Sequence, residues 1–292
     1  MENGRFGPIE TNNKPKKTYR VDYNRLITFA MIVVIVILGA VIFIDAKKEP
    51  EQPNSFQMTI PDNTDSLSII GSEIAQISPE ELRPLPEAEG MLPIFRIANT
   101  NEKKVAIVVD DFESADNLET LIGLCGTFGA RLTLFPTGAE VAKMPDLWIN
   151  ATFAGHEIEN HTMDDTRLST LADEDKAKSI EDQTKVVRSV IGEGYTPHFL
   201  TTGDLEDDTD EFLHSWLAGN GYYGIVRWDE YMPKTFDLVK PGAILSYPLT
   251  DAGLKALSQA IPVLKENGYE MVTLNELFMY PGSFGDTSQT AG

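Results

Sequence analysis

The strongest constraint on the fold is an alternation of short apolar runs and amphipathic segments between residues 102 and 280. The run 104–109, KVAIVV, is typical of a strand that is buried on both faces. The segment 173–191 has the apolar periodicity of a long helix that Asp173 could cap. Further strands are expected at 131–135, 156–161, 198–201, 223–226, 243–246 and 271–274, and further helices at 117–128, 140–153 and 254–267. This order predicts an α/β fold with parallel strands and crossover helices, either a barrel or a doubly wound sheet.

The composition excludes several classes of protein. Hydrophobic residues make up 42% of the 292 residues, which is enough for a packed core. The 45 acidic residues against 24 basic ones give a formal net charge of −21, and such a surface would repel nucleic acid. The single cysteine, Cys125, excludes an internal disulfide and a zinc site made of several cysteines.

The uncharged run 26–44, LITFAMIVVIVILGAVIFI, predicts a membrane-spanning helix. At 1.5 Å per residue it would extend about 28 Å, close to the thickness of a bilayer core. We assign residues 26–45 to an uncleaved signal anchor, because the residues after the run form a poor cleavage site. Six basic residues precede the run, so residues 1–25 are expected in the cytoplasm and the rest of the chain outside, although Lys47 and Lys48 weaken this bias.

Residues 46–101 are predicted to be an acidic, proline-containing extracellular linker, of which 82–97 could lie on the surface of the domain. The folded domain is expected over 102–280. The turn-forming composition of 281–292 predicts a disordered tail. The chain is therefore expected to be a single-pass protein of the cell membrane.

Acidic and histidine side chains follow two of the expected strands. Asp110 and Asp111 end the first strand, where side chains of an α/β fold can enter a site, but where an acidic turn could also cap the next helix. His161 and Asp165 lie four residues apart and could bind Zn²⁺ or a harder divalent ion together with a distant aspartate. Alternatively, His161 satisfies a backbone carbonyl and Asp165 belongs to a turn.

Several segments, in order and spacing, resemble the polysaccharide deacetylases with the NodB homology domain, also called carbohydrate esterase family 4. The segments are VAIVVDDFES, GARLTLFPTG, GHEIENHTMDD, PGAILSYP and ALSQAIPVLKENGYEMVTLNEL, and the resemblance extends over about 102–278. It implies a distorted (β/α) barrel.

The resemblance also implies roles for particular residues. Asp110 would be the general base, and Asp111 and His161 would be ligands of a divalent metal ion such as Zn²⁺, Co²⁺ or Mn²⁺. Asp165 stands where the family has its second histidine ligand, so it could be a third ligand. Tyr247 stands where the family has the late histidine that protonates the leaving amine.

Two of the departures from the family pattern bear directly on catalysis. Tyr247 is a poor general acid at neutral pH, and the family's arginine, which orients the base, falls at Leu200. Arg227 or His198 could replace the missing groups. The simpler interpretation is that Arg227 pairs with Asp229 or Glu230 and that His198 caps a strand.

Two classes of function remain open at this point. The first is a membrane-anchored extracellular deacetylase that removes N-acetyl groups from peptidoglycan or another N-acetylated polysaccharide, and a related hydrolase with Asp165 as metal ligand is a variant of it. The second is a catalytically impaired member of the same family that binds glycan or a wall protein. Deacetylation exposes amines, so this acidic protein is expected to hold the deacetylated glycan more firmly than the acetylated one.

Overall fold

The computed structural model describes residues 77–284 except 237. In chain order, the elements are α2 (Pro79–Leu82), β1 (Ile94–Phe95), β2 (Lys104–Asp110), α3 (Ala115–Phe128), β3 (Thr133–Leu134), α4 (Gly138–Lys143), α5 (Pro145–Phe153), β4 (Glu157–Ile158), the 3₁₀ helix η1 (Leu168–Thr170), α6 (Asp173–Ile191), β5 (Phe199–Leu200), the 3₁₀ helix η2 (Leu205–Thr209), α7 (Glu211–Gly219), β6 (Gly224–Val226), β7 (Glu230–Tyr231), β8 (Ile244–Pro248), α8 (Asp251–Glu266), β9 (Glu270–Val272) and α9 (Leu274–Leu277).

The strands form two sheets, and every strand pairing within them is parallel. One sheet has the order β1-β6-β5, and the other has the order β4-β3-β2-β8-β7 with β9 paired to β2. Isolated bridges join the sheets at two places, Asn160 with Leu200 and Ile97 with Ala243. The strands therefore follow one another around a distorted barrel, and the expectation of an α/β fold with parallel strands is confirmed.

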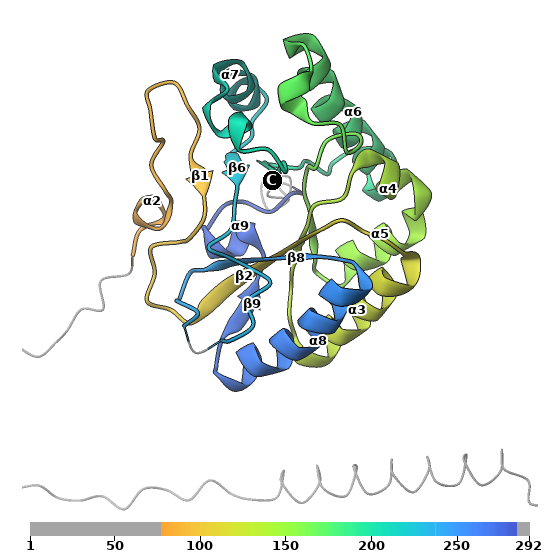
Figure 1. Cartoon of the computed structure of the whole chain (residues 1–292), viewed down its shortest axis with the longest axis vertical. Helices are drawn as coiled ribbons and strands as arrows, with labels where there is room; N and C mark the ends of the chain where they lie inside the picture. The colour runs from red at the N-terminus through yellow and green to blue at the C-terminus, as the bar shows by residue number, and fades with distance from the viewer. Residues whose placement is uncertain (1–76, 237, 285–292) are drawn as a thin grey trace, which may run out of the picture. The chain divides into compact units, whose positions relative to one another are not determined.

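Hydrophobic packing explains why the helices surround these strands. The side chains that alternate along β2 divide between two clusters: Val105, Ile107 and Val109 pack with α3, α5 and α8, whereas Ala106 and Val108 pack with aromatic residues inside the barrel. Helices α3 and α8 lie side by side against the β2–β8 pair (Figure 1). A third cluster joins β5 and β6 to α6 and α7.

Most helices lie where the sequence places them. Helix α6 has the predicted bounds, and Pro145 divides the region 140–153 into α4 and α5. Ala172 rather than Asp173 is the N-cap of α6, so Asp173 contributes as an acid of the first turn. Helix α7 was not predicted; Asp210 caps it by accepting a hydrogen bond from the backbone N–H of Leu213.

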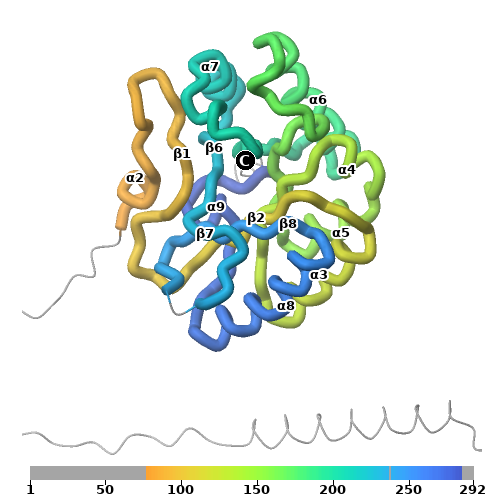
Figure 2. The backbone as a smooth tube through the Cα atoms, in the orientation of Figure 1, coloured from red at the N-terminus to blue at the C-terminus, as the bar shows by residue number. Residues whose placement is uncertain are grey.

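The folded domain begins before residue 102, within the range predicted to be linker. Strand β1 pairs with β6, so the two run side by side in Figure 2. The Phe95 side chain is fully buried and makes edge-to-face contacts with Phe199 and Phe278, at ring-centroid distances of 5.1 and 4.7 Å. This segment is a structural part of the barrel because burial of its two apolar residues outweighs the surrounding prolines and acids.

The end of the chain also differs from its prediction where the structure describes it. The Ser283 side chain is buried, and its hydroxyl donates a hydrogen bond to Glu159 Oε1 at 3.3 Å. Residues 285–292 lie outside the described residues, as do the predicted cytoplasmic tail 1–25, the predicted membrane helix 26–45 and most of the predicted linker. Among the helices of residues 77–284, none combines the length and the apolar character that a membrane crossing requires.

Candidate functional site

A cavity of about 530 Å³ lies beyond the carboxyl ends of β2, β4 and β5. Its walls come from the loops that follow these strands, and they include three of the predicted site residues: Asp111, His161 and Asp165. This is the end of a parallel α/β barrel where the loops of different strands can converge on a ligand. The cavity is therefore the candidate functional site.

Asp110 ends β2 but does not line this cavity. Burial raises its pKa to about 7, and the neighbouring Asp111 and Glu140 add to the shift. One of its carboxylate oxygens is buried and has no hydrogen-bond partner among residues 77–284. A carboxyl group with this pKa could exchange a proton near neutral pH, as a general base must.

The residues around Asp110 hold the turn in an unusual conformation. Asp111 has a φ of 49°, in the left-handed region that side chains other than glycine rarely adopt. The next backbone N–H, that of Phe112, donates to Glu140 Oε1 at 2.9 Å. Glu140 also accepts hydrogen bonds from Thr137 at the start of α4. Glu140 was not among the residues predicted from the sequence, because its only local signal is its position three residues after a capping threonine.

His161 has one ring nitrogen engaged with the backbone. Its Nδ1 lies 3.0 Å from the carbonyl oxygen of Thr201, which can only accept, so Nδ1 carries the hydrogen of this bond. Burial lowers the pKa of His161, although Asp111 and Asp165 oppose the shift, and the ring is therefore favoured in its neutral form. In that form Nε2 has a free lone pair, as in histidines whose other nitrogen is fixed by a carbonyl.

The residues at the cavity do not fit a complete metal site. Asp111, His161 and Asp165 line the same space, but within residues 77–284 no three His, Cys, Asp or Glu side chains are grouped so that they could hold one ion. A site made of protein side chains needs about three such ligands around one point. The predicted ligand set is thus brought to one cavity without converging, and we derive no step through a metal ion.

Tyr247 lies away from the cavity. Its position on β8 pairs with Val109, and its side chain is fully buried in the cluster between the strands and the outer helices. The hydroxyl has no hydrogen-bond partner in the described part of the chain, and burial raises the pKa of Tyr247 further above its usual value. Tyr247 therefore cannot donate a proton to a ligand in the cavity.

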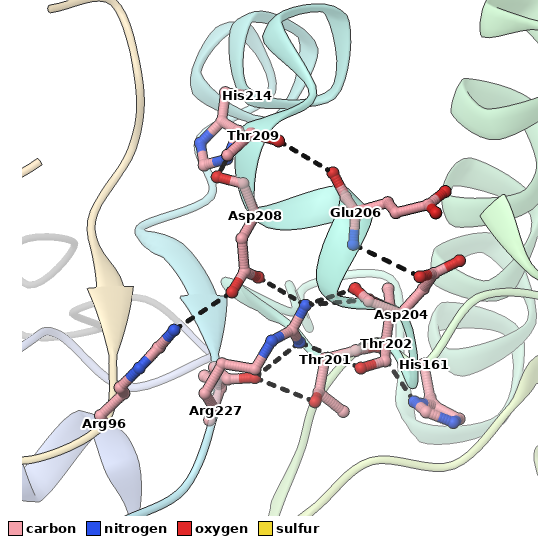
Figure 3. A network of polar contacts seen from close by, with 11 residues as sticks. Arg96, His161, Thr201, Thr202, Asp204, Glu206, Asp208, Thr209, His214 and Arg227 are labelled. Atoms are coloured by element: carbon pink, nitrogen blue, oxygen red, sulfur yellow. Dashed lines mark hydrogen bonds and ion pairs between the residues drawn. The ribbon is translucent and has the colours of Figure 1, made fainter. Parts of the chain in front are cut away.

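The two possible replacements for the missing groups have other partners. Arg227 is 4% exposed, and its guanidinium donates to the carbonyl oxygens of Thr202 and Asp204 at 3.0 and 2.8 Å and pairs with Asp208 at 2.6 Å (Figure 3). It thus holds the loop after β5, whose Thr201 carbonyl accepts from His161. The His198 ring stacks on Tyr223 with a centroid distance of 4.7 Å and does not line the cavity.

Several residues of the cavity were missed from the sequence. Arg167, Thr202, Asp204 and Asp207 contribute to its walls. The only signal for Asp204 and Asp207 was the acidic run that ends at Asp210, and such a run is more often a solvated turn. Near the site, Tyr231 is 53% exposed, and its ring lies 5.8 Å from that of Trp228.

Comparison with known proteins places this architecture in a family. The model of the polysaccharide deacetylase family matches residues 97–216. A peptidoglycan-N-acetylglucosamine deacetylase of Bacillus cereus is 29% identical over 200 residues, which are 62% of this chain and 90% of the relative. A chitooligosaccharide deacetylase of Bradyrhizobium is 22% identical, over 64% of this chain and 98% of the relative.

Solved structures share the fold. The Bc1960 peptidoglycan N-acetylglucosamine deacetylase superposes with a TM-score of 0.58 at 20% identity, over 65% of this chain and 94% of that one. A CE4-family pseudoenzyme from Bacillus anthracis gives 0.56 at 18% identity, over 63% of this chain and 68% of that one. In sequence over this range and in fold, the chain is similar to polysaccharide deacetylases.

Proposed function

We propose that this protein is a membrane-tethered, extracellular member of its family that binds N-acetylated cell-wall glycan without efficient hydrolysis. The observation that carries the proposal is the place of Tyr247, which stands at the family's proton-donor position but is wholly buried in the core. A general acid contributes about 10²–10⁴-fold to a rate. Binding needs only the cavity and its hydrogen-bonding walls, and both are present.

Other features of the site agree with this proposal. Leu200, at the family's arginine position, is buried among apolar side chains and offers no charge to orient a base. The exposed ring of Tyr231 lies near Asp110 and Asp111, whose charges raise its pKa after the larger effect of burial. Tyr231 lines a separate cavity with Met232 and Phe236, and an exposed aromatic ring of this kind is suited to the apolar face of a sugar.

Hydrolysis of N-acetyl groups is the second candidate function. It is favoured by Asp110, whose pKa of about 7 suits a general base, and by the neutral His161. A divalent ion would polarise the acetamide carbonyl in such a reaction. The cavity residues would have to rearrange to hold that ion, because they do not converge on one point in the described part of the chain.

The proposed membrane anchor is inferred from the uncharged segment 26–45, and its orientation is inferred from the basic residues before that segment. Alkaline phosphatase fused after residue 292 would report the orientation, since it is active only outside the cytoplasm. Activity agrees with an extracellular domain. An inactive fusion of normal abundance would contradict this orientation.

One experiment on the full chain in lipid nanodiscs distinguishes glycan binding from hydrolysis. Binding of N-acetylated chitooligosaccharides is measured by calorimetry, and acetate release is measured after addition of Zn²⁺, Co²⁺ or Mn²⁺. Binding without acetate release supports the binding function. Acetate release that Asp110→Asn abolishes and Tyr247→Phe leaves intact supports hydrolysis, and the absence of both binding and release refutes both candidates.

A further inference from the structure

One fully buried acid of the cavity, Asp207, has no side-chain partner in the described part of the chain, although Asp204, Asp208 and Asp210 do. Asp204 pairs with Arg167 at 3.0 Å, Asp208 with Arg227 at 2.6 Å, and Asp210 with Lys176 at 2.5 Å. Asp207 lies among them in η2, its side chain is 0% exposed, and neither of its carboxylate oxygens has a hydrogen-bond partner in the described part of the chain.

Asp207 differs from these neighbours in a second respect. It lines the cavity, whereas Asp208 and Asp210 do not. Burial raises its pKa, and the hydroxyl of Thr202 and the charge of Arg227 oppose that shift without forming a bond that satisfies the carboxylate. A buried carboxylate without donors is unfavourable unless a ligand supplies them.

The rest of the cavity indicates the charge of that ligand. Asp111, Asp164 and Asp165 also line it, and none of them forms an ion pair within residues 77–284. The one basic side chain of the walls, Arg167, is already engaged by Asp204. A cationic donor would therefore be favoured here over a neutral or anionic one.

The volume is suited to a sugar-sized ligand, since small-molecule sites enclose roughly 300–1,000 Å³ and this cavity encloses about 530 Å³. In an N-acetylated glycan, a cationic group arises where an acetyl group has been removed and the free 2-amino group is protonated. We propose that Asp207 anchors a subsite for the protonated 2-amino group of a de-N-acetylated hexosamine, an inference that rests on the proposed glycan binding. The ligand is then a partly deacetylated glycan, and an N-deacetylation reaction carried out elsewhere must supply it.

A rival explanation lies within the protein. The Nε of Arg227 is also buried, and no described residue accepts a hydrogen bond from it. A small side-chain rotation could bring it to Asp207 in the free protein. That arrangement would make Asp207 a structural residue, so its loss would change stability and leave ligand preference unaltered.

The test compares two matched oligosaccharides on the full chain in nanodiscs. Tetramers of glucosamine and of N-acetylglucosamine are titrated at low salt and at about pH 6, where the amine is protonated. We expect the wild type to bind the glucosamine tetramer at least about tenfold more tightly, as a charged hydrogen bond allows. Asp207→Asn should remove this preference while N-acetylglucosamine binding is kept.

Asp164→Asn is the matched control. Asp164 lines the same cavity, but it is exposed and already accepts a hydrogen bond from the backbone N–H of Thr166 at 2.9 Å. The variant removes one charge from the same walls and should keep most of the preference. Thermal unfolding of both variants shows whether each is folded.

Each other result contradicts the inference in a recognisable way. Equal affinity of the wild type for both tetramers, or a preference that persists in Asp207→Asn, overturns the subsite and leaves glycan binding intact. An equal loss in Asp164→Asn points to diffuse charge rather than a subsite. A loss of stability in Asp207→Asn with unchanged preference establishes the rival pairing with Arg227, and failure to bind either tetramer refutes the proposed function itself.

Discussion

Replacement of Arg227 by methionine is expected to destabilise the domain strongly. The guanidinium is 4% exposed, donates hydrogen bonds to the carbonyl oxygens of Thr202, Val226 and Asp204, and pairs with Asp208 at 2.6 Å. Removing one partner of a buried ion pair costs about 3–5 kcal/mol, because the other charge stays buried. Asp208 keeps a second partner, Arg96 at 3.2 Å, so we expect the lower end of this range.

Urea unfolding of wild type and Arg227→Met measures this change in free energy. Arg131→Met is the matched control, since Arg131 pairs with Glu276 at 2.7 Å but the two side chains are 43% and 45% exposed. Exposed pairs contribute about 0–1 kcal/mol. The double variant with Asp208→Asn should recover about 1–2 kcal/mol, because it also removes the unpaired carboxylate.

A second measurement separates support of the loop from general stability. Arg227 fixes Thr202, and the preceding carbonyl, that of Thr201, accepts from His161 Nδ1. Loosening this loop should shift the nitrogen resonances of His161 toward a mixture of tautomers. If Arg227→Met costs no more than Arg131→Met and leaves the His161 spectrum unchanged, our account of this network is wrong.

Three further predictions concern other parts of the molecule. The pKa of Asp110 is about 7 in the folded state against 3.8 for an ordinary aspartate, so the folded state binds the proton more tightly, and this group lowers stability as pH rises through that interval. Urea unfolding at about pH 5 and pH 8 should therefore show a smaller pH dependence in Asp110→Asn, and an unchanged dependence would contradict the assignment. Phe95→Ala should cost about 3–5 kcal/mol in the same assay, whereas Leu85→Ala, at a side chain 82% exposed, should stay within about 0.5 kcal/mol. Tyr247→His should cost about 1–3 kcal/mol by leaving a buried polar ring, and acetate release should not increase; a gain of activity would refute the placement of this residue.

The class of fold could be predicted because its signals are local. Strand β2 is an apolar run rich in β-branched residues, and α6 has an apolar stripe over 173–191. Each element can therefore be predicted from its own residues, without knowledge of the elements that it packs against. Strand β1 is different because it consists of two residues among prolines and acids, and its stability comes from β6, far along the chain. Non-local pairing of this kind leaves little trace in a single sequence.

The candidate site was predictable in part for a related reason. His161 and Asp111 follow strands directly, and the parallel arrangement then brings their loops to one cavity. Asp207 could not be selected, because a partnered and an unpartnered acid look alike in the run 204–210. Only the ion pairs of the folded chain distinguish them.

The face on which Tyr247 lies could not be predicted either, and it bears on the choice between binding and hydrolysis. Every residue of β8 is buried, so the strand lacks the polar alternation that would reveal its faces. The register between β2 and β8 determines the face of each residue: Tyr247 pairs with Val109, and Pro248 pairs with Asp110. Paired residues project to the same side and successive residues to opposite sides, so Tyr247 faces the outer helices while Asp110 faces the other way.

A residue of β8 could assist Asp110 only from the face that Ser246 and Pro248 occupy. Proline has no titratable group, and the Ser246 hydroxyl is buried and has no hydrogen-bond partner in the part of the chain that the structure describes. A substitution at position 247 would therefore not place a proton donor beside Asp110. Bringing that position to the Asp110 face would require a shift of the strand by one residue, and such a shift would move the entire apolar set of β8 to the wrong face. Packing of the β8 side chains in the core thus keeps position 247 away from Asp110 and disfavours hydrolysis. The loops that form the cavity are not part of this packing, so their residues can change to suit a bound glycan without disturbing β8.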